Sequence, residues 1–121
     1  MKNIVYTGYF ANIQEYIKKG LTPISIAGKS PNFFQGDEWK FFAPSWDIYS
    51  KYKSGELSED GYVERYIPER LGKLNIENIK ALLEFEENPI LLCYEKEGFC
   101  HRHIVCDWLN ANGIPCKEYC A

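Results

Sequence analysis

A chain of 121 residues with 45% hydrophobic and 26% charged residues is typical of one soluble globular domain, spanning 1–121. The net charge of −3 disfavours a nucleic-acid-binding protein, which needs a basic surface to neutralise phosphates, but it leaves room for one small anion. No apolar leader opens the chain and no apolar segment has the length of a membrane span, so we expect a cytoplasmic protein without a membrane partner.

The first part of the chain alternates strands and helices. Residues 3–7 are β-branched and aromatic, and this predicted strand ends at Gly8. Residues 10–20 place apolar side chains at helical spacing and end in two lysines and a glycine, which is typical of a helix with a favourable C-terminal charge. Residues 22–27 are the second predicted strand, and Gly28 follows it.

Residues 29–46 fit neither a helical nor a strand period, although the segment is rich in aromatic residues. These are Phe33, Phe34, Trp39, Phe41, Phe42 and Trp46. A long irregular segment in a compact domain is usually functional, so we predict an aromatic-rich loop or lid that could stack on a ring. The alternative is a satellite hydrophobic core under a long loop.

Polar residues predict where the next helices begin. Ser45 and Ser58 are placed to cap the helices that follow them, and Pro68 should end or kink the second of these. Asn75 is placed to cap a third helix over 76–88, whose apolar residues recur with a period of 3.6.

The last part of the chain returns to the strand–helix–strand pattern. Residues 90–94 are a continuous apolar run, which is typical of a strand covered on both faces. A helix from about Cys100 to Gly113 follows, and residues 114–120 are the last predicted strand. This order predicts an α/β fold, a small Rossmann-like three-layer sandwich with a mainly parallel four-stranded sheet.

Several candidate binding residues follow the strands of this predicted sheet. Ligands bind beyond the carboxyl ends of parallel strands, where Gly8, Gly28 with Lys29, and Cys93 would gather. The aromatic segment leaves from the same edge and ends at Ser45. We therefore take these five residues as candidate ligand-binding residues.

The sequence Cys100-His101-Arg102 opens the last predicted helix, where free backbone N–H groups and the helix dipole favour an anion. Arg102 could add a bidentate contact to a phosphate or carboxylate. The same field lowers the pKa of a thiol, which makes Cys100 a candidate nucleophile. Glu95 could orient His101 or accept its proton, so we take Glu95, Cys100 and His101 as candidate catalytic residues.

A purely structural interpretation of the same residues stays open. His101 shares the apolar stripe of its helix and could be a satisfied, half-buried histidine. Arg102 could pair with Glu95 or Glu97 only to hold the loop. Cys93, in an apolar run, is most simply a small core residue.

The five cysteines all lie in the last third of the chain. A secreted disulfide scaffold would spread pairs along the chain, so we expect reduced thiols. Zinc could use Cys93, Cys100, His101 and Cys106, but the paired spacing of structural zinc sites is missing and adjacent side chains diverge at a helix start. Zinc therefore ranks low, and the sequence requires no cofactor.

Three stretches carry a family resemblance. They are LLCYEKEGFCHRHIV, SIAGKSPNFF and FFAPSWDIYSKYKSGELSEDGYVERY. The chain resembles the domain of unknown function 488 family, including its YeaO-like members, in which a Leu-Leu-Cys-x-Glu strand end precedes Cys-His-Arg at a helix start. YFAN at 9–12 and APSW at 43–46 look like a short, single-domain branch. The resemblance implies an α/β fold but no established reaction, and the Asp-x-Arg of many relatives is replaced here by Ser-Ile-Ala at 25–27.

Three functions remain as alternatives. The first is a small enzyme or binding protein for an anionic, ring-bearing ligand such as a nucleotide-like metabolite. The second is a non-catalytic domain that docks a protein partner through its aromatic segment, which requires exposed Trp39, Phe41 and Phe42. The third is a metal or redox role for the late cysteines. Substrate, reaction and oligomeric state are left open.

Overall fold

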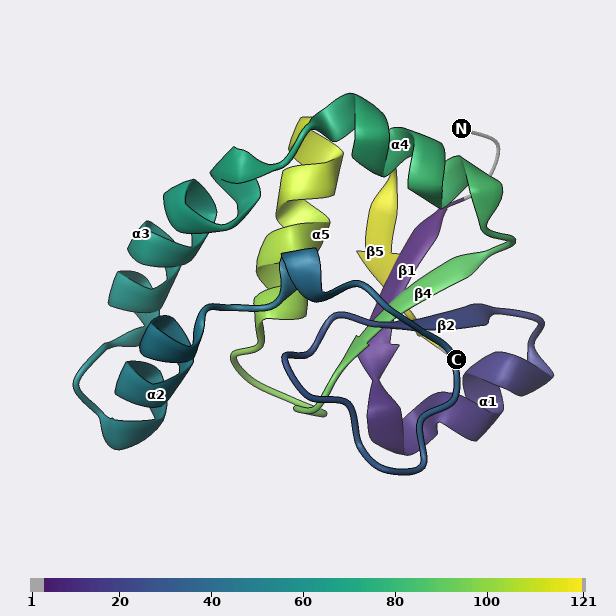
Figure 1. The fold of residues 1–121 in the computed structure, drawn as a ribbon. Coiled ribbons are helices and arrows are strands. Elements are labelled where there is room, and N and C mark those ends of the chain that lie inside the picture. Colours follow the sequence, from purple (N-terminus) through teal and green to yellow (C-terminus); the bar gives the residue numbers. More distant parts are fainter. Residues whose placement is uncertain (1–3, 121) are drawn as a thin grey trace.

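The computed structural model describes residues 4–120, which contain a five-stranded sheet. Figure 1 shows the sheet with the helices around it. The strands are β1 (Val5–Tyr9), β2 (Thr22–Ser25), β3 (Asp37–Glu38), β4 (Pro89–Cys93) and β5 (Cys116–Glu118). Their order across the sheet is β3-β2-β4-β1-β5, and every neighbouring pair is parallel. The carboxyl ends of all the strands therefore meet at one edge. Asn3, at the start of the first predicted strand, lies outside the described residues.

The helices begin largely where capping residues predict them. They are α1 (Ile13–Lys18), α2 (Trp46–Ser54), α3 (Glu59–Glu69), α4 (Ile76–Phe85) and α5 (His101–Ala111), with short 3-10 turns at Phe10–Asn12, Lys40–Phe42 and Leu71–Lys73. Ser45, Ser58 and Asn75 each accept a hydrogen bond from a backbone N–H in the first turn of the following helix, as expected of N-caps. Pro68 lies in the last turn of α3, one residue before the helix ends.

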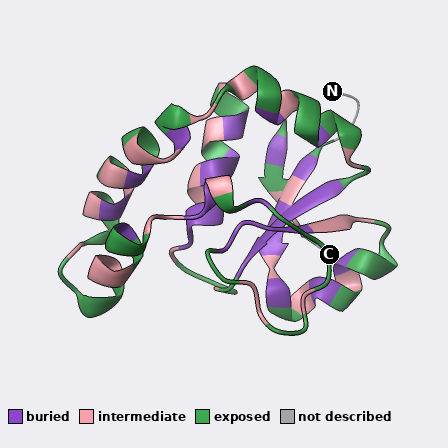
Figure 2. Cartoon of the chain, viewed as in Figure 1, coloured by how far each residue is buried: buried purple, intermediate pink, exposed green. Residues whose placement is uncertain are grey.

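Helices cover both faces of the sheet because β4 is apolar on both sides. Leu91 and Cys93 belong to a large core with α3, α4 and α5, whereas Ile90 and Leu92 belong to a smaller core with α1. Every residue of β4 is buried, as the continuous apolar run predicts (Figure 2). A mixed α/β fold with a parallel sheet is confirmed, and the Rossmann-like description stays a prediction.

The prediction of four strands is wrong, because β3 adds a fifth. This strand is only two acidic, exposed residues long and lies inside the aromatic-rich segment 29–46. It pairs with Ile24 and Ser25 of β2, and the N–H of Trp39 then donates to the carbonyl of Ser25. Two polar residues are too few to show the alternating pattern of a strand. This strand is therefore recognised only from its pairing with β2.

Most aromatic residues of segment 29–46 are part of the cores and do not form a free lid. Trp39 and Phe42 are buried in the large core, and Phe41 packs against it. Phe34 packs beside Phe10 on the opposite face of the sheet. The rings thus have a structural role, as the alternative proposed, but Trp39 and Phe42 join the main core and do not form a satellite one. The two ends of the segment are left to shape a site.

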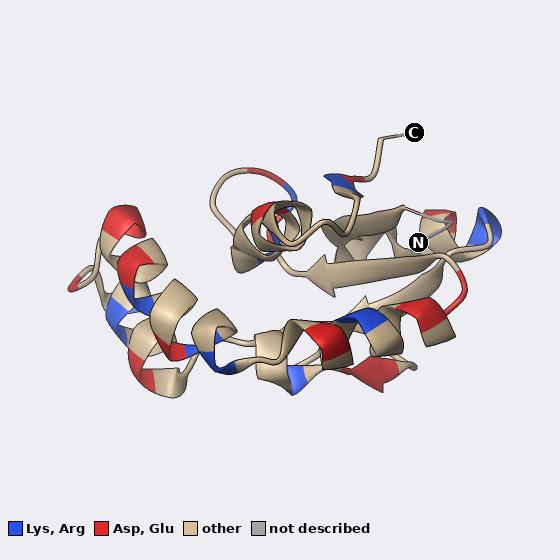
Figure 3. Cartoon of the chain, turned by 90° about the horizontal axis from the view of Figure 1, so that it is seen from above, with Lys and Arg blue, Asp and Glu red and all other residues tan. Residues whose placement is uncertain are grey.

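Helices α2 and α3 extend beyond the sheet and stand beside its carboxyl edge (Figure 1). Figure 3 shows acidic and basic residues mixed along these helices and along α4, while β4 is uncharged. Within residues 4–120, no helix combines the length and the apolar character that a membrane span requires.

Candidate functional site

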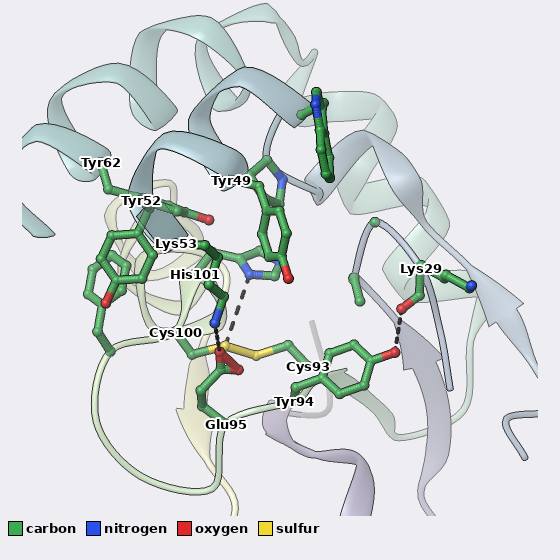
Figure 4. A pocket seen from close by; sticks show the side chains of 15 residues that line it. Lys29, Tyr49, Tyr52, Lys53, Tyr62, Cys93, Tyr94, Glu95, Cys100 and His101 are labelled. Carbon is green, nitrogen blue, oxygen red and sulfur yellow. Dashed lines mark hydrogen bonds and ion pairs between the residues drawn. A yellow bond between two sulfur atoms is a disulfide. The ribbon is translucent and has the colours of Figure 1, made fainter. Parts of the chain in front are cut away.

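A pocket of about 670 Å³ lies beyond the carboxyl ends of β2 and β4 (Figure 4). Its lining residues are Ala27, Gly28, Lys29, Pro44, Trp46, Tyr49, Tyr52, Lys53, Tyr62, Cys93, Tyr94, Glu95, Phe99, Cys100 and His101. Loops after two parallel strands supply one side, α2 and α3 supply the other, and the start of α5 closes the floor. This is the position at which open parallel sheets bind ligands.

Aromatic side chains dominate the walls of the pocket. Tyr52 on α2 and Tyr62 on α3 pack edge to face, and Phe99 packs against both rings. Trp46 and Tyr49 lie with ring centroids 5.8 Å apart and are both exposed, Trp46 to 77%. Exposed aromatic rings beside a pocket are available to stack on a flat ligand.

Two lysines and one carboxylate supply the charge of the pocket. Lys53 lies 3.7 Å from the Glu95 carboxylate, and both side chains are partly exposed. Lys29 follows β2, and its carbonyl accepts a hydrogen bond of 2.5 Å from the Tyr94 hydroxyl. Burial, with the Glu95 charge, raises the pKa of Tyr62, so this phenol stays neutral. Figure 4 shows the Lys53 ammonium directed into the pocket toward Glu95, whereas the side chain of Lys29 points away from these two groups.

His101 is a neutral base whose tautomer is determined by one hydrogen bond. Its Nε2 lies 2.7 Å from the carbonyl oxygen of Ile26, which can only accept, so Nε2 carries the proton. Burial lowers the pKa of His101 to about 4, and the nearby Arg102 charge acts in the same direction. Nδ1 therefore keeps its lone pair unprotonated at neutral pH. The Nδ1 atom lies 4.0 Å from Sγ of Cys100.

Cys93 and Cys100 are joined by a disulfide, which corrects the expectation that all thiols are reduced. Cys93 is the last residue of β4 and Cys100 is the residue before α5, so the loop 94–99 returns one to the other. Spacing along the chain could not show that this loop closes on itself. The remaining cysteines, at 106, 116 and 120, are free.

Arg102 is buried beneath the loop and does not line the pocket. Its guanidinium donates to both carboxylate oxygens of Glu118, with the closest contact at 3.0 Å. It also donates to the carbonyls of Glu95 and Lys96 and, at 3.3 Å, to Sγ of Cys93. These contacts hold the loop 94–99 in place. They match the structural alternative, with the carboxylate of Glu118 in place of Glu95 or Glu97.

The structure brings six of the nine candidate residues together and leaves three outside. Gly28, Lys29, Cys93, Glu95, Cys100 and His101 all line the pocket. Arg102 is not among the lining residues, and Ser45 caps α2, where its hydroxyl accepts from Ile48 N–H at 3.2 Å. Gly8 lies against Tyr16, whose hydroxyl would be 2.6 Å from an added Cβ, so its smallness serves packing.

The wall formed by α2 was not predicted from the sequence. Tyr49, Tyr52 and Lys53 lie three and four residues apart and therefore share one helix face. That spacing is visible in the sequence, but nothing local indicates that this face turns toward the end of β4. The packing of α2 and α3 beside the sheet decides it.

One family model matches this chain, and it covers the whole pocket. The model, DUF488-N3a, is described as "Active DUF488-N3 subclade" and matches residues 23–113. Comparison with curated proteins gave no match, and neither did comparison with solved structures. The match includes β2, β4, α5 and the loops between them, well over half of the chain. The chain therefore belongs to the DUF488 family.

Proposed function

We propose that this protein binds a small anionic molecule that carries a flat ring, such as a nucleotide-like metabolite. The observation that supports the proposal is one pocket of about 670 Å³ that combines aromatic walls with two lysines. Small-molecule sites commonly have volumes of about 300–1,000 Å³ and pair apolar walls with a few polar groups. The pocket also lies at the edge of the sheet where parallel folds place ligands.

The aromatic and charged residues of the pocket take separate roles in this proposal. The exposed rings of Trp46, Tyr49 and Tyr94 stack on the ring of the ligand. Lys53 binds its anionic group, the role predicted for Arg102 from the sequence, and Lys29 adds positive charge at the rim. The buried guanidinium instead holds the loop that carries Glu95.

The proposal extends to catalysis by proton transfer. The Nδ1 atom of neutral His101 accepts a proton, and the Glu95 carboxylate, also in the pocket, accepts or returns one. The description of the matched subclade contains the word "Active", which agrees with an enzyme. The reaction class that fits these groups is acid–base chemistry on the bound ring or its substituents.

Docking of a protein partner through the aromatic segment has lost the feature that favoured it. Trp39 and Phe42 are buried and Phe41 packs against the core, so these rings do not form an exposed surface. The exposed aromatic residues that remain, Trp46 and Tyr49, belong to the pocket.

A ligand panel tests this proposal. Thermal shift with nucleotides, sugar phosphates and simple anions identifies a binder, and calorimetry then gives its Kd. We expect Trp46→Ala and Lys53→Ala each to weaken binding by about tenfold, because each removes a stacking or charged contact worth about 1.4 kcal/mol.

Matched control variants lie outside the pocket. Phe85 is an aromatic residue 84% exposed at the end of α4, and Lys80 lies on the same helix. Phe85→Ala and Lys80→Ala should leave Kd unchanged. A binder whose affinity falls equally in the controls, or a panel with no binder at all, would contradict the proposal.

A further inference from the structure

We propose that the reduced protein binds one Zn²⁺ ion through Sγ of Cys93, Sγ of Cys100 and Nδ1 of His101. The fourth coordination position of this ion faces the pocket and is free for water or ligand. The inference concerns the same pocket as the proposed function, but it does not depend on which organic ligand binds there. In the zinc-bound protein Nδ1 of His101 is a metal ligand, so Glu95 takes over as the proton acceptor of the pocket.

The three donor atoms already lie together at the floor of the pocket. They are within 4.8 Å of one another, and all three residues are buried. Tetrahedral zinc, with bonds of about 2.0–2.3 Å, holds its sulfur and nitrogen ligands about 3.5–3.8 Å apart. The separation of 4.0 Å between Cys100 Sγ and His101 Nδ1 is close to that requirement.

The surroundings of His101 are an independent indication of a metal. A metal-ligating histidine almost always donates its other N–H to a carboxylate or a carbonyl, which fixes the ring and its tautomer. Here Nε2 donates to the carbonyl of Ile26 at 2.7 Å. The lone pair that remains is on Nδ1, which Figure 4 joins to Sγ of Cys100, and Sγ of Cys93 lies within 4.8 Å of it.

Both sulfur atoms lie where a thiolate is stabilised. The guanidinium of Arg102 donates to Sγ of Cys93 at 3.3 Å. Cys100 is the N-cap residue of α5, where the free backbone N–H groups and the helix dipole favour negative charge. The conformation of Cys100 is extended, with φ −154° and ψ 142°. Its side chain therefore does not follow the helical path, and the adjacent His101 can share a site with it.

Reduction of the disulfide prepares the site. A dithiol reductant supplies two electrons and two protons, becomes a disulfide itself, and leaves Cys93 and Cys100 as thiols. Zn²⁺ then replaces the two thiol protons, which pass to solvent. The two Cα atoms are 7.3 Å apart, so the backbone leaves room for the sulfurs to separate around an ion. Metal binding and the disulfide exclude each other, and the oxidised protein should bind no zinc.

The site is of the open kind. Within residues 4–120 the cluster has three ligands, whereas a structural zinc site has four from the protein. All three ligands line the pocket, and so does Glu95. A water on the fourth position would therefore share the pocket with a carboxylate that can accept its proton.

Cobalt and zinc titrations of the reduced full chain test this inference. We expect one equivalent of Co²⁺ to produce a thiolate-to-cobalt charge-transfer band, and zinc to displace it. Cys93→Ser and Cys100→Ser should each weaken binding by at least about tenfold. Cys106→Ser, at a buried free cysteine, and Cys120→Ser, at an exposed one, should bind like the wild type. Protein oxidised with diamide should take up no metal.

Three outcomes would overturn the inference. They are no charge-transfer band in the reduced wild type, equal loss of binding in Cys106→Ser, and unchanged binding in Cys93→Ser and Cys100→Ser. If the variants do not fold, X-ray absorption of the zinc-loaded wild type decides, because the inference requires two sulfur ligands and one imidazole. Failure of the ligand panel would leave these metal measurements unaffected, so the two proposals fail separately.

Discussion

His101 illustrates how one buried side chain couples folding to the chemistry of the pocket. The hydrogen bond to Ile26 fixes its tautomer, and burial keeps the ring neutral. At a pH where the His101 side chain of the unfolded chain is protonated, keeping the ring neutral in the folded protein lowers the free energy of unfolding. The same feature that makes Nδ1 available as a base or ligand therefore makes the fold sensitive to acid.

The pH dependence of stability should reveal this residue. Because the pKa of folded His101 is lowered to about 4, the unfolded chain binds one proton more than the folded chain between about pH 4 and 6.5. As far as His101 is concerned, the free energy of unfolding has its full value above about pH 6.5, where the ring is neutral in both states. The free energy of unfolding then decreases as the pH falls toward about 4, at up to about 1.4 kcal/mol per pH unit. Urea unfolding at about pH 7 and about pH 5 measures it.

His101→Gln is the variant that isolates this effect. It should lose the part of the acid sensitivity that comes from His101, although other groups still titrate. His103→Gln is the matched control, because the pKa of His103 is also lowered by burial but its side chain is only partly buried. An identical pH dependence in wild type and His101→Gln would contradict the assignment.

At the scale of elements, the loop between β4 and α5 is held by a side chain from the helix that follows it. Arg102 reaches back to the carbonyls of Glu95 and Lys96 and across to Glu118 of β5. Glu118 also accepts a hydrogen bond of 2.6 Å from Thr7 of β1. One guanidinium thus connects the pocket loop to the edge of the sheet.

We expect Arg102→Leu to destabilise the protein by about 3 kcal/mol, because it removes the cation paired with Glu118 and the donor to the carbonyls of Glu95 and Lys96. Arg65→Leu on α3 is the control. That arginine pairs with Asp47 and Glu69 at the surface, where such pairs contribute less than about 1 kcal/mol. Urea unfolding measures both variants. Equal losses of unfolding free energy would show that the buried position of Arg102 has no special role.

At the scale of the whole molecule, the order of the strands in the sheet determines where the pocket lies. β4 lies between β1 and β2, so its carboxyl end is flanked by the loops of both neighbours. Its side chains separate the large core from the small one. The rigid centre of the fold therefore supports Cys93 directly, whereas α2 and α3 contribute the outer wall of the pocket.

Substitution at the centre of β4 should affect the whole domain at once. Leu91→Ala removes a fully buried side chain from the large core and should cost about 2–5 kcal/mol. Leu82→Ala, at a residue 40% exposed on α4, should cost less than about 2 kcal/mol. Circular dichroism and tryptophan fluorescence should report one shared transition for each variant, since Trp39 and Trp108 lie in or against the large core. Separate transitions would indicate that the two cores unfold independently.

The sequence by itself determined the elements whose signals are local. Ser45, Ser58 and Asn75 accept hydrogen bonds from residues two or three positions away, so their caps are visible in any short window. The apolar run of β4 predicts burial on both faces for the same reason. Six of the nine candidate residues line one pocket, in agreement with the prediction that the ends of parallel strands meet at one edge.

Only the tertiary structure decided which distant groups meet. Three features join segments that are far apart in the sequence, and no local pattern in either segment indicates its partner. They are the pairing of β3 with β2, the hydrogen bonds from Arg102 to Glu118, and the wall formed by α2. The convergence of Cys93, Cys100 and His101 has the same origin, since it depends on how the loop 94–99 returns to the end of β4. Local hydrogen bonding and periodicity act over a few residues, whereas the chemistry of the pocket depends on packing between elements.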